Sequence, residues 1–526
     1  RGGVPEPAPG REVAGFPVRL PALDIHTIGA GGGSIARLDP GGALTVGPES
    51  AGAEPGPACY GRGGTAPTVT DADLVLGRIP AGAAFPGLGR LDAGEAATAL
   101  LDALTGAPAS ATRPPSSAES LAAGVVAVVD AAMEQAVRSV TVERGVDPAG
   151  LALVAFGGAG PLHACALAEA LGMAAVIVPP RAGVLSAVGL LCSPRQRELV
   201  RSWPDPAGRE GLEEALAALG AEARAAVAGI GAGGAAEPEV EVEYALDCRY
   251  RGQSHELSVS TVEGFHAEHE RRNGYARPEA PVEVVAIRAR ARRPAPLEPD
   301  DLPPPTRERR TGPTVAVEPD CTVWIPAGWV AEPGPLGAWI LTRTTDHDRA
   351  ALSDNAGSGG GSLDPAALRI LIARLTGVAD EMGAVLRRAA FSPNIKERAD
   401  CSAALFTPAG ELLAQAEHIP VHLGSMPDAV AVIVDEAHRD GDLWILNDPY
   451  RGGTHLPDIT LISPVIEGAD LLGFAASRAH HADIGGPTPG GMPALSESLD
   501  DEGVVIPPTR ADDAVLSELA SQMRNP

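Results

Sequence analysis

The feature that most constrains the fold is a strand, a glycine turn, a helix and a second strand in direct succession between residues 151 and 180. LALVAF (151–156) is a continuous apolar run of strand length, and the tight turn GGAGP follows it. An Ala/Leu-rich helix then extends to Leu171, Gly172 ends it, and AAVIVPP (174–180) is the next strand. This order is a βαβ unit, which predicts an α/β fold with a parallel sheet covered by helices.

Capping residues predict two helices before this unit. Asp92 can begin a helix that runs to about Leu104, and Ser116 or Ser117 can begin another that runs to about Glu143. Aspartate and serine side chains accept hydrogen bonds from the unpaired N–H groups of a first helical turn, which is why they mark helix starts.

After the unit, alternating apolar and polar residues predict a smaller α+β region. An alanine-rich helix over 212–229 precedes three runs of period two, EVEVEYAL (239–246), HELSVS (255–260) and VEVVAIRARARR (282–293). Such alternation is typical of half-buried antiparallel strands. We expect TVWIPAGW (322–329) and GAWILT (337–342) to complete this region.

A change of composition marks the start of another domain. SDNAGSGGGSLDP (353–365) is rich in Gly and Ser and has the composition of a flexible linker. Asp364 can cap the helix that follows, with Pro365 at its first position and apolar residues at helical spacing to about Ala389.

Charge and cysteine usage exclude several classes of protein. The 41 basic and 68 acidic residues give a net charge of −27, which argues against a nucleic-acid binder because such proteins need a basic surface. The six cysteines are widely spread without a CxxC pair, a pattern that fits reduced thiols in a cytoplasmic protein. No uninterrupted run of about 18 apolar residues offers a membrane span, so no membrane partner is expected.

Two glycine-rich segments are candidate anion sites. In DIHTIGAGGGSIARL (24–38), four of the five residues from Gly29 to Gly33 are glycine and Ser34 follows, so backbone N–H groups can approach an anion closely. The segment matches neither GxxxxGK[ST] nor a GxGxxG at a helix start, and a glycine-rich β-hairpin is the alternative. FGGAGPLHA (156–164) lies at the strand-to-helix turn, where α/β sheets bind ligands and a helix N-terminus favours anions. A simple tight turn is the alternative there.

Histidines are concentrated in one part of the chain. Six of the 12 lie between residues 418 and 481, partly in the motifs HLPD and RAHHADIGG. Imidazole and carboxylate form a ligand set suited to Mn, Fe or Zn, although no zincin motif is present. The alternative is structural histidines, and His438 is expected at the surface. The residues that the two motifs offer are His455, Asp458, His480, His481 and Asp483.

The chain contains a single lysine, Lys396, and arginine supplies all its other basic residues. The lysine lies in SPNIKERADCS (392–402) beside Glu397, Arg398 and Asp400. A lysine that escapes such a strong preference for arginine indicates a role for an ammonium group, such as binding a carboxylate or a phosphate. The alternative is a solvated charge run at a helix end.

Together these motifs resemble the hydantoinase/5-oxoprolinase family. The segments that resemble its A-type half are DIHTIGAGGGSIA, VGPESAGAEPGPACYGRGGTAPTVTDADLVLGR (46–78), LVAFGGAGPLHA (153–164) and RAGVLSAVGLL (181–191). Those that resemble its B-type half are the stretch 363–406, HIPVHLGSMP (418–427), NDPYRGGTHLPDITL (447–461) and RAHHADIGG (478–486). The resemblance covers nearly the whole chain.

The resemblance implies an α/β fold class with three parts. These are part of an actin-like ATPase second lobe over 1–205, an A-type C-terminal α+β region over 206–345 and, after a linker over 346–363, the N-terminal part of a mixed α/β B-type domain over 364–526. The family's first phosphate loop, of the type DxGGTFTD, is not among these residues. We therefore expect an inner fragment that binds ATP weakly or not at all by itself.

The resemblance also implies roles for individual residues. Asp24 would position a metal ion or the attacking water. Nucleotide phosphates would lie against a hairpin formed by Gly29, Gly31, Gly32, Gly33 and Ser34, and the nucleotide-side turn would use Gly157, Gly158 and Gly160. A metal site of two histidines and one aspartate corresponds to His455, Asp458 and His480, with His480 preferred to His481. The substrate or a phosphate would contact Lys396, Glu397, Arg398 and Asp400.

The implied activity is ATP-dependent ring opening of a cyclic amide such as 5-oxoproline or a hydantoin. Its cofactors would be ATP and Mg²⁺, with Mn²⁺ or Zn²⁺ in the B-type half. The expected partners are the small-molecule substrate and further subunits, in a homo-oligomer or an A/B-type assembly, in the cytoplasm. Two alternatives are an ATP-dependent carboxylase of acetone or acetophenone, which shares both halves, and a truncated product that acts only as a subunit scaffold.

Overall fold

The structure of the 526-residue chain is a computed structural model. It describes residues 11–13, 16–18, 23, 25–82, 84–85, 89–104, 117–228, 240–253, 256–273, 276–295, 297–344, 364–390, 394–395, 399–417, 422, 424–487, 493 and 495–523. The predicted linker over 346–363 lies outside these residues. The described residues form a mixed α/β protein with two compact units. The first comprises Arg1–Gly183, Arg307–Gly334 and Ala338–Pro526, and the second comprises Val184–Thr306 and Pro335–Gly337.

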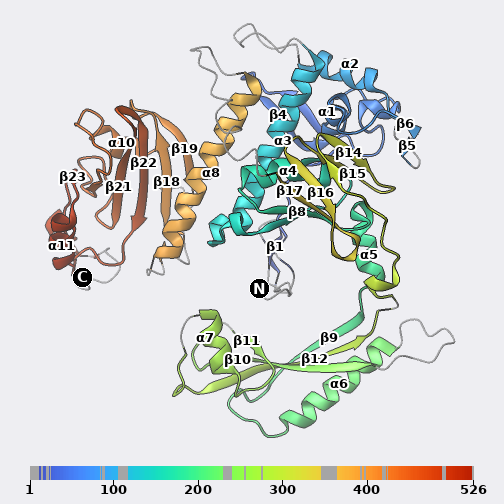
Figure 1. Ribbon diagram of the computed structural model, residues 1–526. Coiled ribbons are helices and arrows are strands. Elements are labelled where there is room, and N and C mark those ends of the chain that lie inside the picture. The colour runs from blue at the N-terminus through green and yellow to red at the C-terminus, as the bar shows by residue number, and fades with distance from the viewer. Residues whose placement is uncertain are drawn as a thin grey trace. The chain divides into compact units, whose positions relative to one another are not determined.

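The N-terminal part of the first unit combines short antiparallel strand pairs with helices (Figure 1). The pairs are β1 (Arg11–Val13) with β2 (Phe16–Val18), β3 (Ser34–Leu38) with β4 (Leu44–Ser50), and β5 (Ala84–Phe85) with β6 (Gly89–Arg90). The helices are α1 (Val69–Val75), α2 (Ala93–Leu104) and α3 (Ala118–Val140). Helices and hairpin share one apolar core that includes Leu44, Val69, Leu100 and Val125.

The helix starts agree with the predicted caps. The carboxylate of Asp92 accepts hydrogen bonds from two N–H groups in the first turn of α2. Ser117, one of the two serines proposed, caps α3 by accepting from the Ser120 N–H. The α-helix ends at Val140, and a short 3-10 turn follows until Gly145 closes it in a left-handed conformation. Glycine suits that position because it has no Cβ to clash there.

The predicted βαβ unit is present. It consists of β7 (Ala152–Val154), α4 (Gly160–Ala170) and β8 (Ala175–Val178), and β7 runs parallel to β8. In the described part of the chain this sheet has the order β13-β16-β17-β8-β7. The strands added to the unit are β13 (Arg310–Thr311), β16 (Trp329–Pro333) and β17 (Trp339–Arg343), and β14 (Thr314–Val317) pairs separately with β15 (Thr322–Ile325).

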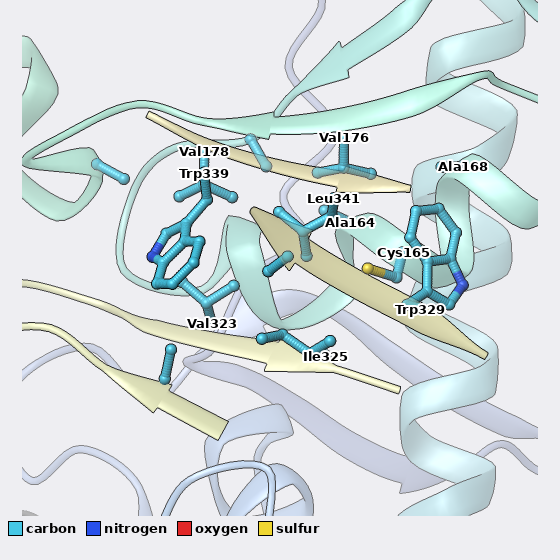
Figure 2. Close-up of a cluster of buried hydrophobic side chains, with 14 of the residues drawn as sticks. Ala164, Cys165, Ala168, Val176, Val178, Val323, Ile325, Trp329, Trp339 and Leu341 are labelled. Carbon is cyan, nitrogen blue, oxygen red and sulfur yellow. The ribbon is translucent and has the colours of Figure 1, made fainter. Parts of the chain in front are cut away.

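The prediction that residues 322–342 complete the α+β region is wrong, because β17 pairs antiparallel with β8. The physical reason is the burial of two tryptophans. Trp329 and Trp339 are almost fully buried in one core with Val176 and Leu341 (Figure 2). Burying each large apolar side chain stabilises the fold by about 2–3 kcal/mol, so these strands join the sheet whose apolar face they can cover.

The second unit contains the helix and the antiparallel strands predicted for the α+β region, but it begins at Val184 rather than at 206, because the strand Val282–Arg293 pairs with a strand that precedes the predicted bound. Its helices are α5 (Leu185–Leu191), α6 (Leu212–Ala228) and α7 (Phe265–Asn273). Its strands are β9 (Arg195–Ser202), β10 (Glu241–Tyr250), β11 (Leu257–Val259) and β12 (Val282–Arg293), in the antiparallel order β11-β10-β12-β9. Alternate residues of β12, such as Ile287 and Ala289, are buried in one core with Leu219 and Val227 of α6. The period-two pattern therefore identified both the strands and their buried face.

The chain beyond residue 364 returns to the first unit and forms a separate sheet within it (Figure 1). The order of this antiparallel sheet is β19-β18-β22-β21-β20-β23 in the described residues. Its strands are β18 (Cys401–Phe406), β19 (Leu412–Glu417), β20 (Trp444–Leu446), β21 (Asp458–Glu467), β22 (Asp470–His480) and β23 (Thr509–Arg510). The helices of this part are α8 (Pro365–Ala389), α10 (Met426–Ala431) and α11 (Asp513–Ser521).

Helix α8 begins and ends as the sequence predicts. The carboxylate of Asp364 accepts hydrogen bonds from two N–H groups of the first turn, and Pro365 occupies the first helical position. The helix packs against α3 on one side and against β18 and β19 on the other (Figure 1). Arg138 of α3 forms an ion pair with Glu381 of α8 at 2.9 Å, so charge as well as packing joins the two helices.

One helical stretch of the described residues, Ala118–Arg144, is long and apolar enough to cross a membrane by length and composition alone. Its residues Leu121, Val125 and Val129 are buried in the core that α3 shares with α1 and α2. The core helix of a globular protein passes the same test.

The six cysteines are all free, and all but Cys192 are buried. Burial raises the pKa of Cys248 to about 11 and that of Cys321 to about 12, so these thiols hold their protons at neutral pH. Because the thiolate is the reactive form, we expect a thiol reagent at pH 8 to label Cys192 first. The other thiols should react only after denaturant is added. Mass spectrometry of labelled peptides measures this order, and early labelling of Cys248 would contradict it.

Two aspartates in helix α1 are expected to respond oppositely to removal of their charge. Asp71 is buried and accepts hydrogen bonds from the backbone N–H groups of Ala58, Cys59 and Thr68. Asp73 is equally buried, but its oxygens have no hydrogen-bond partner among the described residues. Asp71→Asn should therefore cost about 2–4 kcal/mol, because an amide cannot accept all these bonds. Asp73→Asn should instead stabilise the fold at pH 8, because it removes a buried charge whose oxygens have no hydrogen-bond partner among the described residues.

The pH dependence of stability provides a second measurement on Asp73. Burial raises its pKa from 3.8 to about 6, although the nearby His163 and Arg78 lower it. The folded protein therefore binds a proton between about pH 4 and 6 that the unfolded chain does not, so this group destabilises the fold as pH rises through that window. Asp73→Asn should flatten the thermal-unfolding profile there, and an unchanged profile would contradict the assignment.

Candidate metal centre and glycine-rich site

Three side chains that the sequence proposed as metal ligands lie together at one end of the β21–β22 pair. Asp458 begins β21 and His480 ends β22, and the two are directly opposite each other in the register of the sheet. His455 lies three residues earlier, in the turn that leads into β21. The ligand atoms of these three side chains all lie within 4.8 Å of one another. The antiparallel register therefore brings HLPD and RAHHADIGG to one place.

The three donor atoms form a nearly equilateral triangle. Asp458 Oδ1 is 3.0 Å from His455 Nε2 and 3.2 Å from His480 Nδ1, and the two imidazole nitrogens are 3.1 Å apart. In octahedral geometry, bonds of about 2.2 Å separate neighbouring donors by about 3.1 Å, whereas tetrahedral zinc with bonds of about 2.05 Å separates them by about 3.3 Å. The spacing of this two-nitrogen, one-oxygen set is therefore compatible with convergence on one divalent ion, such as Mn²⁺, Fe²⁺ or Zn²⁺.

The electrostatics of the cluster favour a bound cation. Burial raises the pKa of the Asp458 carboxyl, but hydrogen bonds from His422, His455 and His480 outweigh that effect and hold its pKa well below its usual range. The carboxylate is therefore ionised although it is buried, as a metal ligand must be. The side chain of His455 is 43% exposed, so the cluster opens toward solvent on that side.

Asp400, one of the predicted catalytic residues, lies beside this cluster. Its Oδ2 is 3.9 Å from His480 Nδ1, and its carbonyl accepts the His480 N–H at 3.1 Å. The neighbouring strand β18 pairs with β22 from Cys401 onward, which places the residue before it at the same edge of the sheet. The other predicted catalytic residues, Lys396, Glu397, Arg398 and Asp24, lie outside the described residues.

The other proposed residues of the histidine motifs lie differently. His481 is exposed, and the Asp483 carboxylate accepts the Gly485 N–H at 3.0 Å rather than joining the three-residue group. His438, expected at the surface, packs its ring against Trp444 and Phe474. That packing follows from the neighbouring apolar strands β20 and β22, which sequence spacing does not reveal.

Several polar residues around the cluster were not singled out as site residues from the sequence. His422 Nε2 is 3.3 Å from Asp458 Oδ2, and Thr454 Oγ1 donates to the same oxygen at 2.8 Å. Arg478 is fully buried, and its guanidinium donates to Thr460 and Ser425. His422 belonged to the noted concentration of histidines, but nothing in its spacing indicated which carboxylate it meets.

The two glycine-rich segments also lie side by side. Thr70 at the start of α1 donates through its N–H and its hydroxyl to the Gly32 carbonyl, at 2.8 and 2.9 Å. A Cβ placed on Gly32 would lie 3.9 Å from the Cβ of Ala159, which precedes helix α4. Ser34 closes the turn, because the Gly31 N–H donates to its hydroxyl at 3.0 Å. The hairpin therefore lies next to the N-termini of two helices.

The glycines of these segments differ in what the fold requires of them. Gly29 and Gly157 have positive φ of 60° and 82°, which side chains rarely adopt. By contrast, a Cβ on Gly31, Gly158 or Gly160 would meet nothing within 4 Å among the described residues. Packing within the described chain therefore does not explain these three glycines. Space beside exposed backbone N–H groups at a helix start is what an anion such as phosphate needs.

Both halves of the chain match families of known proteins. A family model described as hydantoinase/oxoprolinase matches residues 1–198, and one described as hydantoinase B/oxoprolinase matches residues 364–518. 5-Oxoprolinase 1 of Arabidopsis thaliana is 33% identical over 551 residues, which cover 94% of this chain and 43% of that protein. Caprolactamase subunit alpha of Pseudomonas jessenii is 37% identical over 301 residues, which cover 53% of this chain and 42% of that subunit.

A solved structure resembles the fold at lower identity. Nucleotide-free acetone carboxylase superposes with a TM-score of 0.52 at 24% identity, over 63% of this chain and 54% of that chain. The chain thus spans less than half the length of the curated relatives named above. Because family models match on both sides of the predicted linker and the oxoprolinase similarity extends over 94% of the sequence, the chain belongs to the hydantoinase/oxoprolinase family.

Proposed function

We propose that the protein takes part in ATP-dependent hydrolysis of a cyclic amide. The observation that carries the proposal is the triangle of His455, Asp458 and His480 in a chain that also holds a paired glycine-rich site. The named activities of the relatives support the substrate class, since 5-oxoproline and caprolactam are both lactams.

In this proposal the A-type half is part of an actin-like lobe that binds Mg²⁺-ATP. Gly32 and Gly33 would present backbone N–H groups to the phosphates, while the Gly31 N–H, bonded to the Ser34 hydroxyl, would hold the turn beside them. Gly157, Gly158 and Gly160 would leave room for the nucleotide at the start of α4. Asp24 would position the magnesium ion or the attacking water.

In the B-type half His455, Asp458 and His480 would hold Mn²⁺, Fe²⁺ or Zn²⁺. When bound, such an ion acts as a Lewis acid and lowers the pKa of a water ligand. Asp400, beside His480, can accept a proton from a group that approaches the cluster. Lys396, Glu397 and Arg398, which precede it in the chain, would contact the substrate or its phosphate.

The chemistry gives ATP a definite role. An amide oxygen is a poor leaving group, and transfer of the γ-phosphoryl group to it breaks the phosphoanhydride bond, releases ADP and leaves an imidate-like phosphate ester. Water then adds to the activated carbon, and opening of the ring C–N bond frees the ring nitrogen and leaves an acyl phosphate. A second water molecule hydrolyses the acyl phosphate to a carboxylate and inorganic phosphate. One ATP is cleaved for each ring opened.

The test supplies the purified full-length protein, including any residues beyond these 526, with Mg²⁺-ATP and 5-oxoproline, hydantoin or caprolactam, and measures ADP and ring-opened product. We expect equal amounts of both, with no requirement for bicarbonate. Gly158→Val should abolish turnover by filling the nucleotide space, whereas Gly150→Val, at another position where a Cβ meets no described atom, should not. A bicarbonate requirement would favour the carboxylase alternative, and absence of turnover with all three lactams would contradict the proposal.

A subunit scaffold without a site of its own is not favoured. A scaffold would not need a buried, ionised carboxylate beside three imidazoles, because burying a charge costs free energy unless other groups compensate it. Measuring bound metal in the purified protein separates the two cases, since a scaffold would contain none.

A further inference from the structure

The two carboxylate oxygens of Asp458 have different surroundings. Oδ1 faces the two proposed ligand imidazoles, at 3.0 Å from His455 and 3.2 Å from His480. Oδ2 points away from them, accepts a hydrogen bond from Thr454 Oγ1 at 2.8 Å and lies 3.3 Å from His422 Nε2. One oxygen is therefore available to an ion, and the other is held by the protein.

The contacts of His422 define the direction of its hydrogen bonds. The ring is fully buried, with Nδ1 at 3.0 Å from Ser402 Oγ and Nε2 facing the carboxylate. A carboxylate can only accept, so Nε2 carries the proton that is donated to Asp458. In the neutral ring Nδ1 then accepts from the Ser402 hydroxyl. Serine, histidine and aspartate thus form one directed chain of hydrogen bonds.

We propose that His422 is a positioning residue that, together with Thr454, makes Asp458 bind its metal ion through Oδ1 alone. The inference rests on the proposed metal site, and it adds the device that sets the denticity of the carboxylate. A carboxylate held on one oxygen cannot rotate to offer both, so it occupies a single coordination position. The position that a second oxygen would take stays open to water or substrate.

Two other roles for His422 agree less well with the geometry. As a fourth ligand it would have to face the same point as the other donors, but it contacts the opposite oxygen and is not part of the three-residue cluster. As a simple core histidine it would need no particular partner. Both of its ring nitrogens instead meet side chains, Ser402 on β18 and Asp458 on β21, so the ring connects the metal ligand to a second strand.

The experiment uses the whole chain, freed of metal and titrated with Mn²⁺ while electron paramagnetic resonance follows the free ion. Loss of a hydrogen bond to a metal ligand typically weakens binding by about 10–100-fold, and we expect that loss for His422→Leu. His422→Gln keeps an N–H donor and should bind within about 5-fold of wild type. Thr454→Val and Ser402→Ala should weaken binding to a smaller extent.

The number of water molecules on bound Mn²⁺ separates positioning from general damage. Broadening of the signal by ¹⁷O-enriched water counts them, and His422→Leu should have about one fewer than wild type, because the released carboxylate can bind through both oxygens. His438→Leu is the matched control, since that histidine packs its ring against Trp444 and Phe474 of the same sheet and is not one of the clustered residues. It should change neither the affinity nor the water count.

The outcomes distinguish this inference from the proposed function. If wild type binds Mn²⁺ tightly and His422→Leu matches it in affinity and water count, the positioning role is overturned while the metal site stands. If His422→Leu and His438→Leu weaken binding equally, the effect is structural and the inference is again overturned. If wild type binds neither Mn²⁺ nor Zn²⁺, both the metal site and the inference fail.

Discussion

Replacing Asp458 with alanine is expected to remove the metal ion from the protein, whereas wild type should retain about one equivalent after dialysis. Asp458 is the only anion among the three proposed ligands. Its carboxylate is ionised although the residue is only 2% exposed. Without it the two remaining imidazoles offer no negative charge to a divalent ion. Loss of a group that only hydrogen-bonds to a metal ligand weakens binding by about 10–100-fold. Loss of Asp458, a direct ligand in this proposal, should therefore weaken binding by more than about 100-fold.

The measurement is elemental analysis of protein dialysed against buffer with defined Mn²⁺ and Zn²⁺. Asp483→Ala is the matched control, because Asp483 belongs to the same RAHHADIGG motif and is not one of the three clustered residues. The control should keep its metal. Equal metal content in Asp458→Ala and wild type would show that the cluster is not the binding site.

Replacing Asn447 with alanine is expected to give a large loss of stability in the B-type half. The side chain is fully buried, and its amide donates to the carbonyls of Leu456 and Val504, at 2.8 and 2.9 Å. Its carbonyl accepts the Ile506 N–H at 2.6 Å. Alanine would leave all three backbone groups without these partners; taking the lower part of the range of about 1–3 kcal/mol for each, a total of about 3–5 kcal/mol is expected.

Thermal unfolding followed by circular dichroism measures this effect. For a domain of this size, about 3–5 kcal/mol corresponds to a fall of roughly 6–20 °C in the Tm of the transition that involves the B-type half. Tyr450→Ala is the control in the same loop, since that side chain is 87% exposed and should shift the transition by little. Similar shifts for both variants would mean that Asn447 does not tie the loop to the segment 504–506.

Local sequence signals predicted the elements well where the signal and its cause are both local. The Asp364 cap, the helix to Ala389 and the βαβ unit all agree with the structure, because capping and apolar periodicity act within one or two turns. The period-two runs identified the antiparallel sheet of the second unit. The strands at 329–343 were assigned to the wrong sheet, because their own pattern does not identify the apolar face that they cover.

The candidate site was predictable to a similar extent. Residue type and motif selected His455, Asp458 and His480, which lie together in the structure, although their role as metal ligands remains a prediction. The contacts of His422 and Ser402 could not be read from the sequence, since they depend on which strands are neighbours and in what register. Lys396, prominent by composition, lies outside the described residues.

The sequence by itself determined the family and most helices and strands, and it identified the chemically capable residues, because these depend on residue type and on periodicity over a few neighbours. Only the tertiary structure decided which of those residues meet. The register of β21 with β22 sets Asp458 opposite His480, and the start of β18 places Asp400 and Ser402 beside them. The physical reason is that strand pairing is fixed by burial of whole apolar faces across long separations in the chain, which no local pattern contains.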